Sequence, residues 1–175
     1  TDGSDTLATY TYDTYGRRIS KTINGETTYF LYDDTGAGLT AEYTQTGELI
    51  RGYKYQPQGT YTTDPVALKT KSLNQIEGQP TQYDYSFYQN DHLGTPQRLM
   101  QISGATVWAG EYDAFGQINE TITQVEQPLR MAGQYHDKET GFYYNWFRYY
   151  DPSTGRYTQS DPIGLRGGIN TYAYV

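Results

Sequence analysis

Residues 17–34 read RRISKTINGETTYFLYDD, and this stretch decides the fold class because it holds a complete β-hairpin pattern. Side chains alternate in polarity over residues 19–23, as they do in a strand with one buried face. Asn24-Gly25 follows, and this pair favours a two-residue hairpin turn because both residues tolerate positive φ. Residues 27–32 then supply a returning strand of aromatic and β-branched side chains.

A short unit recurs along the chain: Tyr, often followed by Asp, then two or more residues and Gly. Tyr ends a strand and packs on its neighbours, Asp starts the turn by hydrogen bonding to its own backbone, and Gly supplies positive φ. One hairpin cannot bury its own face, so such units must stack. The unit begins at Tyr12, Tyr32, Tyr43, Tyr55, Tyr112, Tyr135 and Tyr150.

The composition predicts an all-β fold with little helix. The 175 residues include 21 Tyr, 5 Phe and 2 Trp, and no long segment has apolar residues at helical spacing. Aromatic residues favour strands and are scarce in disordered chains. A tyrosine ring buries apolar area while its hydroxyl still needs a partner, so a wall with one wet face suits this chain better than a dry core.

Charge and cysteine content exclude several classes of function. The 13 Lys and Arg against 20 Asp and Glu give a net charge of −7, which argues against a nucleic-acid or anionic-membrane partner. There is no Cys, so disulfides, thiolate zinc sites and cysteine nucleophiles are excluded. No apolar run approaches the roughly 18 residues of a membrane span. Residues 1–10 lack a signal pattern and are typical of the interior of a longer polypeptide.

Two stretches interrupt the hairpin rhythm. Residues 60–82 lack strand alternation and contain two prolines, which predicts an irregular excursion with a short helical piece over residues 66–72. Residues 124–134 contain Pro128, which argues against a central strand there because proline cannot donate to a sheet ladder.

Three later blocks give a more specific signal. They are NDHLGTPQRL (90–99), VWAGEYDAFGQ (107–117) and the string from Arg130 onward, which contains YYDPSTGRYTQSDPIGL. In order and spacing they resemble consecutive blocks of the Rhs repeat-associated core domain, and the Tyr-Asp-x-x-Gly unit resembles the YD repeat of the same family. The resemblance divides the chain into YD repeats (1–59), the irregular excursion (60–82) and a core domain (83–175) that is incomplete at its C-terminal end.

The resemblance implies a large bacterial polypeptide whose YD repeats wind into a spiral β-sheet that closes as a hollow shell, or cocoon. The shell encloses a variable C-terminal toxin domain, which an aspartyl-type activity of the core domain cuts free. The implied partners are this toxin domain, a secretion-system spike protein, a chaperone and an immunity protein. The implied location is cytoplasmic before export, followed by secretion or delivery through a type VI or Tc-like system.

Asp161 is the first candidate for chemistry under this resemblance, because it opens the Asp-Pro-Ile-Gly-Leu block. In the family a second aspartate lies in a similar later block, and two close carboxylates can share a proton and act as general base and acid. The later block is not in this chain, so the fragment itself is not expected to be an enzyme, whereas a full-length parent is expected to be an aspartyl-type autoprotease. The alternative left open is that Asp161 only caps a turn with Pro162 and Gly164.

Asp151 and Arg156 are further candidates in the same region. Asp151 stands in Asp-Pro-Ser-Thr-Gly, which is also ordinary turn chemistry. Arg148 and Arg156 could pair with nearby carboxylates and lower their pKa values, or stack on Tyr or Trp146. The structural role is the favoured interpretation for both arginines.

No cofactor or metal ion is expected. The two histidines, His92 and His136, lack the close spacing of a metal site, and the sequence around His92 predicts a tight turn. The glycine-rich stretch GLRGGIN (164–170) fits neither a dinucleotide fingerprint nor a Walker pattern.

One rival class of function stays open, a secreted or cell-surface YD-repeat protein that binds carbohydrate or a partner protein. Sugar rings stack on Tyr and Trp, of which this chain has many. A sugar platform would expose a few rings in one groove, whereas a shell buries its rings along strand after strand.

Overall fold

The computed structural model describes residues 8–34, 38–57 and 62–174, almost entirely as strands in two antiparallel sheets. The ten-stranded sheet contains β1 (Ala8–Tyr12), β2 (Arg18–Ile23), β3 (Glu26–Tyr32), β4 (Leu39–Thr44), β5 (Leu49–Tyr55), β6 (Pro65–Lys71), β7 (Tyr83–Asn90), β8 (Pro96–Gln101), β9 (Thr106–Tyr112) and β10 (Ile118–Thr123). The four-stranded sheet contains β11 (Tyr135–Asp137), β12 (Phe142–Asn145), β13 (Arg148–Asp151) and β14 (Arg156–Tyr157), and the 3-10 turn η1 (Gly164–Gly167) follows. The all-β prediction is confirmed.

Both sheets are meanders in which spatial order follows sequence order, so consecutive strands within each sheet pair with each other. The predicted hairpin is confirmed as β2 and β3, with Ile23 opposite Glu26. Asn24 and Gly25 have φ values of 51° and 84°, as the two-residue turn requires.

The Asp-x-x-Gly turns share one hydrogen-bond pattern. At Asp13 the carboxylate oxygen Oδ1 accepts from the backbone N–H groups two and four residues later, both at 2.9 Å. The Asp backbone carbonyl accepts from the N–H of Gly16 at 3.0 Å. The same pattern occurs at Asp91 and Asp113. The glycines of the units that begin at Tyr32 and Tyr55 lie outside the described residues.

β-Bulges explain why the large sheet curls rather than lying flat. Seven of its nine strand pairs contain a register shift, and extra residues of this kind increase local twist and bend. Four shifts fall at the repeat tyrosines Tyr12, Tyr32, Tyr43 and Tyr55. The repeat unit therefore sets the curvature of the sheet as well as its turns.

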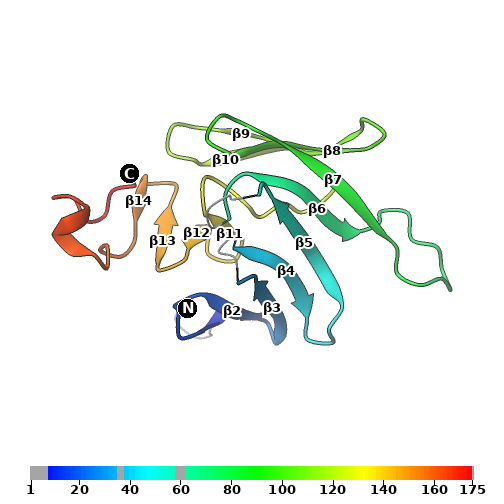
Figure 1. Ribbon diagram of the computed structural model, residues 1–175, viewed down its shortest axis with the longest axis horizontal. Coiled ribbons are helices and arrows are strands. Elements are labelled where there is room, and N and C mark those ends of the chain that lie inside the picture. Colours follow the sequence, from blue (N-terminus) through cyan, green and yellow to red (C-terminus); the bar gives the residue numbers. More distant parts are fainter. Residues whose placement is uncertain (1–7, 35–37, 58–61, 175) are drawn as a thin grey trace.

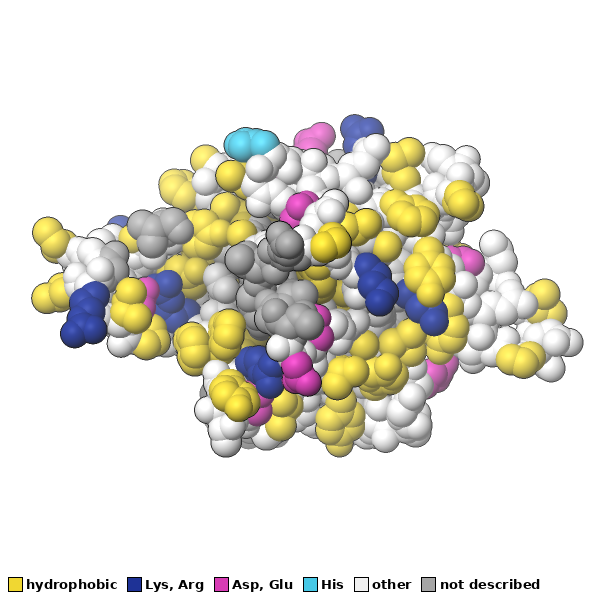
Figure 2. Space-filling view, viewed as in Figure 1, with side chains coloured by type: hydrophobic (Ala, Val, Ile, Leu, Met, Phe, Trp, Pro, Cys, Tyr) yellow, Lys and Arg dark blue, Asp and Glu magenta, His cyan; other side chains and the backbone are white. Residues whose placement is uncertain are grey.

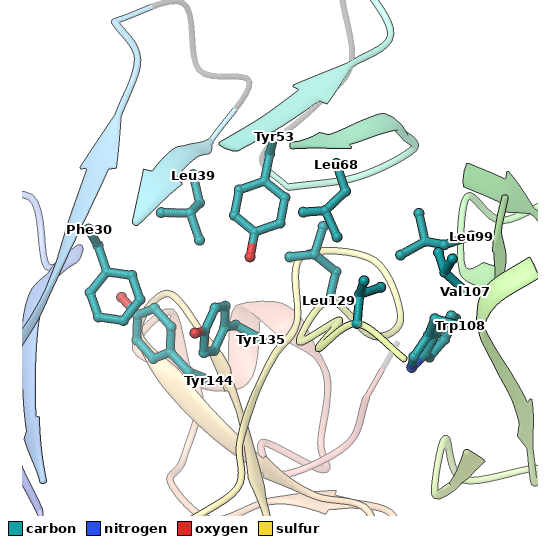
Figure 3. Close-up of a cluster of buried hydrophobic side chains, with 11 residues drawn as sticks. Phe30, Leu39, Tyr53, Leu68, Leu99, Val107, Trp108, Leu129, Tyr135 and Tyr144 are labelled. Carbon is teal, nitrogen blue, oxygen red and sulfur yellow. The ribbon is translucent and has the colours of Figure 1, made fainter. Parts of the chain in front are cut away.

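The concave side of the curl is filled by the chain's own later residues. We call residues 124–145 the inner segment; it runs from the end of β10 through β11 and β12, and Figure 1 shows it at the centre of the curled sheet. Side chains from the sheet and the inner segment meet there (Figure 3). The buried cluster comprises Phe30, Leu39, Tyr53, Leu68, Leu99, Val107, Trp108, Val125, Leu129, Tyr135 and Tyr144.

The short helical piece predicted over residues 66–72 is wrong, because residues 65–71 form strand β6. This strand pairs with β5 on one side and β7 on the other, and its Leu68 is buried opposite Tyr53. Pairing on both sides outweighs the weak alternation of its sequence, so residues 65–71 join the sheet, whereas residues 72–82 of the expected excursion belong to no strand. The absence of a central strand around Pro128 is confirmed, since residues 124–134 belong to no named strand.

Candidate functional site

Asp161 lies in a turn after β14, where backbone and side-chain contacts fix its carboxylate. Oδ1 accepts from the N–H of Ile163 at 2.9 Å, and the Asp161 carbonyl accepts from Gly164 at 2.9 Å. The Asp161 N–H donates to the Thr171 carbonyl at 2.9 Å. The turn predicted from the Asp-Pro-Ile-Gly block is therefore present, and it leaves the second carboxylate oxygen available for a different contact.

That second oxygen pairs with Arg148. The Arg148 Nη2 atom lies 3.1 Å from Asp161 Oδ2, and both side chains are largely buried, at 15% and 17% exposure. The guanidinium also lies over the Tyr157 ring, 3.6 Å from its centroid. Pairing and stacking were alternative roles for Arg148 in the sequence, and the structure combines them.

Asp151 and Arg156 lie at the β13–β14 turn and do not join this pair. Asp151 Oδ1 accepts from the Ser153 N–H at 2.9 Å and the Ser153 hydroxyl at 2.6 Å, and these bonds hold its pKa below the usual value. Arg156 opposes Asp151 in the β13–β14 register, but its side chain is exposed. In the described part of the chain no ion pair of Arg156 is found. The geometry of Asp151 is that of a turn residue.

A pocket of about 290 Å³ opens beside the Arg148–Asp161 pair. Its wall includes the β12–β13 turn, where Trp146 has a φ of 53°, a strained value for a bulky side chain. Two contacts hold this turn: Trp146 Nε1 donates to the Tyr15 carbonyl at 2.8 Å, and the Phe147 ring packs on Gly16. The pocket is lined by Asn145, Trp146, Phe147, Arg148, Tyr157, Asp161, Pro162 and Ile163.

The histidines have separate structural settings. His92 lies in the Asp91–Thr95 turn, as predicted. His136 lies on β11 with its Nδ1 atom 2.8 Å from Arg130 Nη2. Burial and the positive charge of Arg130 lower the pKa of His136 to about 4, so the ring is neutral at pH 7. Within residues 8–34, 38–57 and 62–174, no group of three acidic or histidine side chains is placed to hold a metal ion.

Two buried ionic centres fasten the inner segment to the sheet, and the sequence pattern did not reveal either. In the first, Arg18 Nη1 on β2 lies 2.5 Å from Asp137 Oδ2 on β11, at 1% and 0% side-chain exposure. The Arg18 guanidinium carbon is 4.4–5.2 Å from the centroids of four aromatic rings, which add cation–π attraction. These rings are Tyr10, Phe30, Tyr135 and Tyr144.

The second centre surrounds Glu42 on β4, which is fully buried. Its carboxylate accepts from Arg51 at 3.0 and 2.7 Å, from the Tyr53 hydroxyl, and from the Tyr135 hydroxyl of the inner segment at 3.0 Å. Burial and the negative charge of Glu42 raise the pKa of Tyr53 and Tyr135 well above the usual value, so both hydroxyls stay protonated and donate. A buried carboxylate needs such complete pairing to be tolerated.

Sequence comparison identifies the family. A family model described as RHS protein matches residues 86–122. Over 95% of its length the chain is 35% identical to double-stranded DNA deaminase toxin A of Burkholderia cenocepacia. Over 99% of its length it is 34% identical to toxin protein Tse5 of Pseudomonas aeruginosa.

The chain is an Rhs-family segment. It spans 13% and 15% of the lengths of these two relatives. It is also 32% identical, over 96% of its length, to tRNA nuclease WapA of Bacillus subtilis, of which it spans 7%.

Solved structures share the fold of this Rhs segment. The crystal structure of TcdB2-TccC3-TEV superposes with a TM-score of 0.67 at 19% identity, covering 96% of this chain and 8% of that one. The Photorhabdus luminescens Tc holotoxin pore superposes with a TM-score of 0.65 at 20% identity, covering the same shares. Among the described residues, no helix has the length and apolar character needed to cross a membrane.

Proposed function

We propose that this Rhs segment forms part of the wall of a shell that encloses a C-terminal toxin domain, and that its inner segment closes the shell from within. The observation that carries the proposal is the curled ten-stranded sheet whose concave side is filled and ionically fastened by residues 124–145. The toxin names of its relatives support the same reading. The proposed division keeps YD repeats over 1–59, a joining stretch over 60–82 and a core domain over 83–175.

The direction of the tyrosine rings favours a shell over a sugar platform. Six tyrosines are buried, three in the large core cluster and three in a second cluster on the small sheet, and their rings meet other rings. A protein that used its aromatic residues mainly to bind carbohydrate would leave most of these rings accessible. The buried tyrosines are Tyr53, Tyr135, Tyr143, Tyr144, Tyr150 and Tyr157.

The second part of the proposal is autoproteolytic release of the toxin domain, with Asp161 as one of two carboxylates. The second would come from chain beyond Val175. In that arrangement one carboxylate removes a proton from water, the water oxygen attacks the peptide carbonyl carbon, and the other carboxylic acid protonates the departing amine. Arg148 orients Asp161 through the 3.1 Å ion pair, so it is a positioning residue.

Two variants of the full-length protein test this role of Asp161. Wild type should run as two fragments on a denaturing gel, and Asp161→Asn should remain one chain. Asp151→Asn is the matched control, because it removes a carboxylate from a neighbouring turn that lacks the Arg148 contact. Intact masses would show where the wild-type chain is cut. An uncut wild type, or equal cutting of the Asp161 variant, would refute the role of Asp161.

The proposed location follows from the same family resemblance. Before export the protein would be cytoplasmic, and a type VI or Tc-like system would deliver it. A spike protein, a chaperone and an immunity protein are the proposed partners besides the toxin domain. Co-purification of the tagged full-length protein with the products of neighbouring genes would test this set.

A further inference from the structure

The convex face of the large sheet carries a hollow that the shell role does not use. In the strand register Ala41 lies opposite Gly52, and Lys54 lies opposite Ala67, so small residues of β4, β5 and β6 share the outward face. Gly52 has no side chain to fill this face, and a Cβ built there would meet Lys69 at an ordinary contact distance of 3.6 Å. The resulting hollow has a volume of about 430 Å³, within the range of small-ligand sites.

Aromatic rings form the walls of this hollow. Tyr43 and Tyr85 line it, and Tyr85 is 52% exposed. A second hollow of about 460 Å³ is also lined by Tyr85, together with Tyr83, Asp84 and Phe87, which is 45% exposed. Because both hollows are lined by Tyr85, they adjoin on the β4–β8 face, and we call the two together the groove. In the right half of Figure 2, hydrophobic side chains cluster around Lys and Arg side chains on the visible face.

Two lysines give the first hollow a net positive charge, whereas the second hollow is lined by Asp84 and by no Lys or Arg. Lys54 and Lys69 line the first hollow, and neither has a carboxylate partner in the described part of the chain. The Lys69 Nζ atom lies 4.8 Å from the Tyr83 ring centroid and 5.8 Å from that of Tyr85, so the rings hold it at the groove. Asp33 is the acidic side chain at the rim of this hollow. Two unpaired cations in a chain of net charge −7 mark this surface as a site for an anion.

We propose that this groove binds an acidic oligosaccharide, such as a chain of uronic-acid sugars. Flat sugar rings would stack on Tyr43 and Tyr85, and sugar carboxylates would pair with the ammonium groups of Lys54 and Lys69. Asp33 would accept hydrogen bonds from sugar hydroxyls. Nucleic acid fits less well, because two lysines neutralise few phosphates on an acidic protein.

Calorimetry on the full-length protein tests this proposal with defined probes. Tetragalacturonic acid should bind, whereas neutral maltotetraose and a tetra-aspartate peptide should bind at least about tenfold more weakly, because each lacks either the charge or the sugar rings. Affinity should fall as ionic strength rises, since the lysines are at the surface. Absence of tetragalacturonate binding would overturn the proposal, and so would equal affinity for either control ligand.

Three variants locate the site. Gly52→Val fills the hollow without changing charge, and a β-branched residue suits a strand position. Lys69→Gln removes one cation. Each should weaken tetragalacturonate binding about tenfold or more. Lys138→Gln is the matched control, because it makes the same charge change at a 58% exposed side chain that does not line the groove, and its affinity should stay at the wild-type value. Equal losses in Lys69→Gln and Lys138→Gln, or none in Gly52→Val and Lys69→Gln, would overturn the proposal.

Discussion

Substituting Asp137 by Asn should release the inner segment from the sheet, because it leaves the Arg18 charge buried without its counter-ion. The pair is 1% and 0% exposed, and the two residues are 119 positions apart in the chain. Removing one partner of a buried ion pair costs about 3–5 kcal/mol. Asn keeps one acceptor oxygen for Arg18, so we expect a value near the lower end.

Hydrogen exchange on the full-length protein measures this effect where it arises. A local loss of about 3–5 kcal/mol makes amide exchange about 100- to 4,000-fold faster, since each 1.4 kcal/mol is a factor of ten. The acceleration should appear in peptides of β11, β12 and β2. It should be absent from β7 and β8, which do not contact the pair.

A control variant and a double variant separate the effect of this buried pair from that of an ordinary surface pair. Glu48→Gln breaks the exposed Lys71–Glu48 pair, at 54% and 44% exposure, and should cost no more than about 1 kcal/mol. Arg18→Met combined with Asp137→Leu should recover part of the loss, because neither buried charge remains. Exchange in Asp137→Asn no faster than in Glu48→Gln would contradict the claim that this pair fastens the inner segment.

Three further perturbations test other contacts. Gly16→Ala should destabilise the protein by about 1–3 kcal/mol more than Gly25→Ala, because both glycines have positive φ but only Gly16 faces the Phe147 ring. Hydrogen exchange measured at the two turns compares the two variants, and equal destabilisation would contradict the role of the Phe147 contact. Leu129→Ala should cost about 2–5 kcal/mol at its 1% exposed position and accelerate exchange throughout the inner segment, whereas Ile102→Ala at 94% exposure should change little. The pKa of His136 is lowered to about 4 in the folded protein, against 6.5 in the unfolded chain, so the unfolded state binds more protons between these values. The stability that the neutral His136 ring contributes is complete above about pH 6.5 and falls by up to about 3 kcal/mol as the pH drops to 4. When denaturation midpoints are compared across pH, this dependence should be lost in His136→Gln and kept in His92→Gln.

The hairpins could be predicted because their causes are local. Asn24-Gly25 sets its turn through the φ preferences of two adjacent residues, and Asp13 sets its own through bonds within five residues. The same local chemistry predicted the turn at Asp161. The role of a residue can be predicted from the sequence when it depends on contacts with residues nearby in the chain.

The ionic centres could not be predicted, because their partners meet only after the sheet curls. Nothing near Arg18 indicates a carboxylate 119 residues later, and Glu42 has the surroundings of a surface strand residue in sequence. Strand β6 was missed for a related reason: its pairing with β5 and β7 decides its conformation more than its own pattern does. The Arg148–Asp161 pair was open to sequence reasoning, but the choice between pairing and stacking needed the structure.

Enclosure of a cargo domain, which we propose for this Rhs segment, can be tested with one sample that is run under two conditions. The full-length protein would be separated by native size exclusion with light scattering, and the peak fraction would then be run on a denaturing gel. We expect one native particle with the mass of the whole chain that separates into a shell fragment and a C-terminal fragment when denatured. Two native peaks, each holding one fragment, would contradict enclosure.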